Sequence, residues 1–247
     1  MEHFKKERHK HRQSEEIPPD LIEKLRENLQ KVKARIELSA KKVGRRPEEI
    51  KLLPATKYAD LRIMRALVAL GLREFGENQV QQAEEKAKLL GPEITFHMIG
   101  HLQHNKVKKA LKIFASIQSL DSLRLAEELS KRAGERVVPV LLEVNVGGEP
   151  QKYGFAPEEL FEALAKIEKL ENLQVLGLMA VPPWKEDPEE VRPYFRRLRE
   201  LRDEARKRGL GKTGLPELSM GMSHDFEVAV EEGATCVRVG SALFGGL

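Results

Sequence analysis

The sequence predicts a (β/α)8 barrel formed by a single domain. Eight short apolar runs alternate with longer amphipathic stretches, which is the pattern of parallel strands joined by helices. A length of 247 residues suits one barrel of this kind. No glycine-rich dinucleotide-binding motif follows the first apolar run, and this weighs against an open, doubly wound sheet.

The strands and helices can be placed from these runs and from residues that begin helices. The expected strands cover residues 50–56, 72–75, 94–99, 116–120, 138–146, 173–180, 217–221 and 235–240. The helices between them are expected to start near residues 60, 78, 105, 122, 157, 188 and 224. The side chains expected to cap a first turn are Asp60, Asn78, Asp121 or Ser122, and Ser223.

A further helix is expected before the first strand, over residues 18–43. Its apolar positions follow the three-to-four spacing of one buried face and are Ile22, Leu25, Leu29, Val32 and Ile36. The sequence stops a few residues after the eighth strand, so we expect this helix to take the place of an eighth helix in the outer ring. Residues 18–247 would then form the barrel domain, and residues 1–17, rich in both charges, a disordered extension.

Composition predicts a protein of the cytoplasm that binds neither membrane nor nucleic acid. The 43 basic and 39 acidic residues give a net charge of +4, which is too balanced to indicate nucleic-acid binding. No apolar run approaches the ~20 residues that cross a bilayer, and the first residues lack the apolar core of a signal peptide. The single cysteine, Cys236, excludes a disulfide within the chain and fits a reducing compartment.

Lys57 ends the first apolar run, where a parallel barrel keeps its active site. Partial burial at this point would favour the neutral amine, which can attack an aldehyde. The alternative is a lysine that points into water from the end of a strand. The last two strand ends, in residues 218–223 and 237–241, carry glycines, hydroxyls and an arginine. These residues favour the interpretation that Lys57 reacts with an aldehyde.

Arg238 is expected to point into the barrel, because side chains alternate along a strand and two valines flank it on the helix-facing side. A buried arginine needs an acid, a ring nitrogen or a phosphate as its partner, and a structural pair with a carboxylate is the alternative. Gly240 would let a ligand approach the backbone, and Ser241 would add a hydroxyl. A lysine and an anion site on one rim together indicate a phosphorylated aldehyde.

Neither the histidines nor the basic helix indicates a further function. His97, His101 and His104 surround one strand end, but no set of carboxylates or cysteines completes a ligand shell, so we expect no metal. The helix over residues 188–209 is basic on one side and apolar on the other, which is typical of a surface helix with a solvated charged face.

Six ordered motifs, from about residue 18 to the end, resemble the pyridoxal-phosphate homeostasis protein family, whose barrel is related to that of alanine racemase. The motifs are LPATK (53–57), FGENQVQ (75–81), FHMIGHLQ with NK (96–103 and 105–106), GLM (177–179), LSMGMS (218–223), and VRVG with FG (237–240 and 244–245). The cofactor is then pyridoxal 5′-phosphate (PLP). The implied binding residues are Lys57, which forms the aldimine, Asn78, Met220, Ser223, Arg238, Gly240 and Ser241.

Within this resemblance, Ser223, Gly240 and Ser241 hold the phosphate, and Arg238 faces the pyridine nitrogen. Asn78 and Met220 line the cofactor. Thr56 and Ser241 stand where the family has serine and threonine, so both hydroxyls are kept. Tyr153, in contrast, stands where a small polar residue is usual.

The resemblance implies a monomeric PLP carrier that supplies PLP-dependent apo-enzymes and has no catalytic residues. An arginine leaves the pyridine nitrogen unprotonated, which weakens the ring as an electron sink. Racemisation also needs a second base, which in the racemases is a tyrosine from a further domain. None of the tyrosines of this sequence, which are Tyr58, Tyr153 and Tyr194, is predicted to be that base. The alternatives are a weak PLP-dependent amino-acid racemase and a phosphosugar barrel that uses Lys57 as a Schiff-base lysine.

Overall fold

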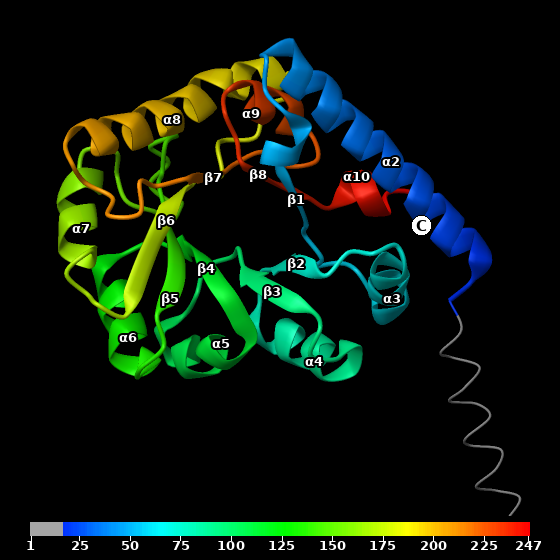
Figure 1. Cartoon of the computed structure of the whole chain (residues 1–247), viewed down its shortest axis with the longest axis horizontal. Coiled ribbons are helices and arrows are strands. Elements are labelled where there is room, and N and C mark those ends of the chain that lie inside the picture. The colour runs from blue at the N-terminus through cyan, green and yellow to red at the C-terminus, as the bar shows by residue number, and fades with distance from the viewer. Residues whose placement is uncertain (1–16) are drawn as a thin grey trace, which may run out of the picture.

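The computed structural model, which describes residues 17–247, is a barrel of eight parallel strands (Figure 1). The strands are β1 (Lys51–Pro54), β2 (Glu74–Glu77), β3 (Thr95–Met98), β4 (Phe114–Leu120), β5 (Val138–Glu143), β6 (Leu173–Met179), β7 (Glu217–Ser219) and β8 (Cys236–Val239). Neighbours in the chain are neighbours in the sheet from β2 to β8, and β8 pairs with β1. A single bridge between Ala55 and Gly76 joins β1 to β2 and nearly closes the barrel. The predicted fold class is confirmed.

Helices surround the sheet, as the alternating pattern predicts (Figure 1). They are α2 (Pro19–Lys42), α3 (Leu61–Ala69), α4 (Val80–Leu90), α5 (Val107–Ile113), α6 (Leu123–Ala133), α7 (Leu160–Ile167), α8 (Arg192–Lys207), α9 (Phe226–Glu231) and α10 (Ser241–Phe244), with 3-10 turns η1 (Pro47–Glu49), η2 (His104–Lys106) and η3 (Pro188–Val191). Within residues 17–247, no helix is both long and apolar enough to cross a membrane.

The helix before the first strand completes the outer ring, as expected. α2 packs against α3, α9 and α10, and after β8 the described chain adds only the four residues of α10 to the ring (Figure 1). Four of its five predicted apolar positions, from Leu25 to Ile36, are buried, whereas Ile22 is partly buried. The predicted disordered extension lies, up to residue 16, outside the described residues.

Of the predicted helix caps, two form and two do not. The Asp60 carboxylate accepts a hydrogen bond of 2.9 Å from the first turn of α3, and the Ser122 hydroxyl accepts one of 3.3 Å from α6. Asn78 and Ser223 cap no helix, because α4 and α9 begin two and three residues after them. Both side chains therefore stay beside the ends of β2 and β7.

The apolar residues form two separate clusters. The larger one fills the layer between the sheet and the helices, and it includes Val237 and Val239 of β8. The smaller one, Leu53, Ile99 and Cys236, lies apart from that layer. Arg238, only 3% exposed, alternates with the two valines, so it faces the interior of the barrel as predicted.

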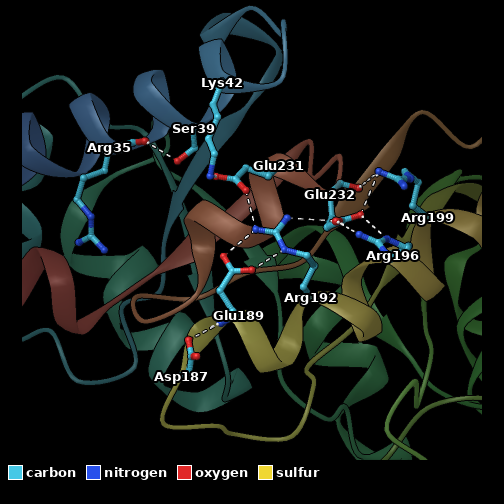
Figure 2. Close-up of polar contacts among 10 residues, drawn as sticks. All are labelled: Arg35, Ser39, Lys42, Asp187, Glu189, Arg192, Arg196, Arg199, Glu231 and Glu232. Carbon is cyan, nitrogen blue, oxygen red and sulfur yellow. Dashed lines mark hydrogen bonds and ion pairs between the residues drawn. The ribbon is translucent and has the colours of Figure 1, made fainter.

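An ion-pair network joins α2, η3, α8 and α9 on the outside of the barrel (Figure 2). Its members are Lys42, Glu189, Arg192, Arg196, Arg199, Glu231 and Glu232. Glu231 of α9 contacts both Lys42 of α2 (2.7 Å) and Arg192 of α8 (2.6 Å), so it links α2 to α8.

Candidate functional site

The predicted binding residues gather at one rim of the barrel. Because all eight strands are parallel, the segments that follow them share the carboxyl rim, where barrels bind their ligands. Those on these segments are Lys57 after β1, Asn78 after β2, Met220 and Ser223 after β7, and Gly240 and Ser241 after β8. Arg238 lies within β8 itself.

The Lys57 side chain is exposed, so the expectation of partial burial is wrong. β1 ends at Pro54, and Lys57 already lies in the turn that follows. Its Nζ lies 4.6 Å from the centroid of the Tyr58 ring, and the Tyr58 residue is itself 85% exposed. The preceding residue, Thr56, is fully buried. The turn is therefore anchored although the amine is open to reactants.

A second lysine and a buried carboxylate hold that turn in place. Glu77 accepts hydrogen bonds from the Thr56 hydroxyl (2.7 Å) and from Lys86 Nζ (2.5 Å). Lys86 also donates to the Thr56 carbonyl (2.7 Å). The other Glu77 oxygen, Oε2, is buried and has no hydrogen-bond partner among residues 17–247. Sequence reasoning did not select Lys86, since a lysine on a surface helix usually points into water.

Arg238 is held by neutral groups. Its Nη1 donates to the Ser219 hydroxyl (2.6 Å) and its Nη2 to the Ala180 carbonyl (2.9 Å). Ser219 in turn donates to Gln118 Oε1 (2.7 Å). In the described part of the chain no carboxylate lies within ion-pair distance of Arg238, which does not support the alternative of a structural ion pair. Burial lowers the pKa of Arg238, but a guanidinium stays charged. Arg238 therefore places a positive charge inside the mouth of the barrel.

Ser223 marks a point where backbone N–H groups converge. Its hydroxyl oxygen accepts hydrogen bonds from the amides of Gly240 (3.0 Å) and Ala242 (3.1 Å). A Cβ at Gly240 would lie 3.1 Å from the Ala55 carbonyl oxygen, so a side chain would crowd β1 there. Ser241 is exposed beside these amides. Hydroxyls and N–H groups that meet at one oxygen are the donors that a phosphate requires, and PLP fits this set.

Asn78 and Met220 differ in their access to a ligand. A Cβ at Gly100 would lie 2.8–2.9 Å from Asn78 atoms, so the segments after β2 and β3 pack tightly. Asn78 lines a cavity of about 290 Å³ that opens between these segments. Met220 is fully buried within the larger apolar cluster, and its role at the cofactor stays a prediction.

The segments after β3, β4 and β5 add polar residues that the sequence did not predict to bind the cofactor. The His101 Nδ1 lies 2.6 Å from Asp121 Oδ2, and the His101 ring stacks on Tyr153 with centroids 3.7 Å apart. Glu143 ends β5 close to Asp121. Burial is the main cause that raises the pKa of Glu143 to about 7, and the negative charge of Asp121 raises it further. Residues far apart in sequence meet here only because the barrel closes, which no local motif could reveal.

The histidines do not assemble a metal site in the part of the chain that the structure describes. His97 is held between Ser116 and Glu74, both at 2.7 Å. His101 pairs with Asp121 instead, so these two histidines have separate carboxylate partners.

Comparison with known proteins gives the family. Residues 22–247 match the family described as alanine racemase, N-terminal domain. The pyridoxal phosphate homeostasis protein of Aquifex aeolicus (strain VF5) is 48% identical over 222 residues, which are 89% of this chain and 96% of the relative. The protein of the same name from Pseudomonas aeruginosa is 41% identical over 222 residues, 89% of this chain and 94% of that one. The chain belongs to the pyridoxal phosphate homeostasis protein family.

The solved structures that resemble this chain are consistent with its membership of this family. An unknown protein from Bifidobacterium adolescentis is 36% identical, with a TM-score of 0.87 over 93% of this chain and 98% of that one. PipY of Synechococcus elongatus PCC7942, solved with PLP bound, is 37% identical, with a TM-score of 0.73 over 80% of this chain and 93% of that one. An alanine racemase of Clostridium difficile 630 shares only the fold, at 16% identity and a TM-score of 0.70 over 91% of this chain and 57% of that one.

Proposed function

We propose that this protein binds PLP through Lys57 and takes part in the homeostasis and supply of the cofactor inside the cell. The observation that carries the proposal is one rim with three features: an exposed lysine on an anchored turn, converging N–H groups at Ser223, and a buried cation at Arg238. The homeostasis proteins at 48% and 41% identity and the relative PipY with PLP bound support PLP as the ligand.

Each residue has one task in this proposal. PLP supplies an aldehyde carbon that bonds reversibly to amines. Lys57 Nζ would bond to this carbon with loss of water, which would hold the cofactor covalently but reversibly. Ser223, Gly240 and Ser241 hold the phosphate, while Asn78 and Met220 line the cofactor. Arg238, fixed by its neutral partners Ser219 and Ala180, would meet the ring nitrogen and keep it unprotonated.

The open position of Lys57 suits a carrier better than an enzyme that must exclude water. With Lys57 exposed and Tyr58 also exposed beside it, a bound aldehyde can be reached by other amines. PLP-dependent apo-enzymes are the expected acceptors, and the reducing cytoplasm is the expected compartment. Amino-acid racemisation is the alternative activity.

Absorption spectroscopy tests the proposal. Titration of the purified protein with PLP is expected to produce the visible band of a lysine-bound aldehyde, and Lys57→Ala is expected to abolish it. Lys185→Ala, which removes a lysine from the segment after β6 on the same rim, is the matched control and should keep the band. A Lys57→Ala protein that folds and still forms the full band would contradict the proposal.

A further inference from the structure

We propose that His101, oriented by Asp121, is the base that accepts the proton from an incoming amino acid when PLP leaves Lys57. The inference rests on the proposed function and adds the step by which the cofactor departs. The Asp121–His101 pair lies on the same rim as Lys57, because His101 follows β3 and Lys57 follows β1 by the same three residues.

His101 has the geometry of an oriented base. Its Nδ1 is bound to Asp121 at 2.6 Å, and the Asp121 side chain is only 6% exposed. A carboxylate at one ring nitrogen places the proton there and leaves the other nitrogen, Nε2, to accept one. No residue from 17 to 247 forms a hydrogen bond to Nε2 in the structure. The Tyr153 ring stacks on the imidazole at an interplanar angle of 9° and holds its plane.

The step needs such a base. A primary amine is protonated at neutral pH and cannot attack until it loses that proton. The incoming ammonium gives its proton to His101 Nε2, and its nitrogen then bonds to the carbon that Lys57 holds. The attacking nitrogen passes a second proton to Lys57 Nζ, the bond from the carbon to Nζ breaks, and Lys57 leaves as an amine that takes up the first proton from His101. Charge and atoms balance, and nothing is oxidised or reduced.

The cavity beside His101 favours an amino acid as the incoming amine. Its volume is about 290 Å³, and His101, Asn78 and Lys106 all line it. Lys106 is partly buried, and its ammonium forms no hydrogen bond or ion pair within the described chain. An unpaired cation in this position would bind a carboxylate, while the amino group of the same molecule lies toward His101.

The experiment measures how fast PLP leaves Lys57 in protein loaded with the cofactor and mixed with an excess of an amine. L-Alanine is the probe that needs a base, and O-methylhydroxylamine, which is neutral at pH 7, is the probe that does not. We expect His101→Gln to slow release to alanine by roughly a hundredfold, the low end of general-base effects, and to leave release to O-methylhydroxylamine unchanged. Asp121→Asn should act in the same direction but less strongly.

His104→Gln, a substitution of the neighbouring histidine of η2, is the matched control and should release PLP at the parent rate with both probes. Lys106→Met should slow release to alanine but not to ethylamine, which has no carboxylate. Equal rates for His101→Gln and the parent, or equal slowing with both probes, would overturn the inference. Failure of the parent to hold PLP on Lys57 would instead overturn the proposed function and this inference together.

Discussion

Glu143 makes the stability of the unliganded protein depend on pH. Its pKa is raised from 4.5 to about 7, chiefly by burial, so the folded state keeps a proton that the unfolded state has lost between these two values. The free energy of unfolding should therefore fall as pH rises from about 4.5 to 7 and become flat above, with a contribution of up to ~3 kcal/mol. Glu143→Gln should remove this part of the decline. Urea denaturation of both proteins at pH 5, 6, 7 and 8 measures it, and parallel curves for the two proteins would contradict the assignment.

Ser223 is expected to bind the phosphate, so its loss should matter only for ligands that carry one. Ser223→Ala removes one donor and should weaken PLP binding by about tenfold, the size of one hydrogen bond to a charged group. Binding of pyridoxal, which lacks the phosphate, should change little. Fluorescence or absorption titration with both ligands measures this difference, and an equal loss for the two would assign Ser223 to the loop structure instead.

Single residues also show where sequence reasoning works and where it stops. Alternation along β8 predicted that Arg238 points inward, because the rule depends only on strand geometry. The exposure of Lys57 could not be predicted, since it depends on where β1 ends and how the next turn is anchored by Glu77 and Lys86. The contact of His101 with Asp121 and Tyr153 needs three segments that only the closed barrel brings together.

At the level of elements, α2 is expected to be an integral part of the barrel. Leu29 is 6% exposed within the core, whereas Leu38 on the same helix is 72% exposed. Leu29→Ala should lower the free energy of unfolding by about 2–5 kcal/mol, as is usual for a buried leucine, and Leu38→Ala by less than about 0.5 kcal/mol. Urea denaturation measures both. A similar small loss in the two variants would mean that α2 is only loosely attached, contrary to the role that its pattern predicts.

The ion-pair network of Figure 2 is expected to stabilise the packing of α2, α8 and α9 on the outside of the barrel. Glu232 is 4% exposed and contacts Arg192 (3.2 Å), Arg196 (2.9 Å) and Arg199 (3.2 Å). Although burial opposes ionisation, hydrogen bonds from Arg196 and Arg192 hold the pKa of Glu232 below its usual value. Glu232→Gln leaves three arginines without their shared partner, so we expect a loss of about 1–3 kcal/mol at low salt.

The matched control for the network is Glu23→Gln, which removes a solvent-exposed pair with Arg26 one turn away on α2. Its stability should change little, as is usual for exposed pairs. Thermal unfolding at low and at 1 M salt should show a larger, salt-sensitive loss for Glu232→Gln. Identical unfolding curves for the two variants would contradict a structural role of the network.

At the scale of the whole molecule, the periodic pattern was sufficient to predict the barrel and the place of α2. Eight apolar runs with short connections allow few other arrangements, and the stripe on residues 18–43 needs a surface to cover. Strand ends shifted by a few residues, and β8 is followed by the four-residue helix α10, because end positions depend on local packing. The rim positions of the predicted binding residues followed from the fold, whereas their hydrogen-bond partners did not.

The measurement that tests the account most directly is the site of covalent PLP attachment. Protein loaded with PLP is reduced with borohydride, digested and mapped by mass spectrometry. The account predicts that the pyridoxyl group is found on Lys57. Attachment mainly to another lysine, such as Lys86 or Lys106, or no attachment at all, would contradict the proposal that Lys57 holds the cofactor.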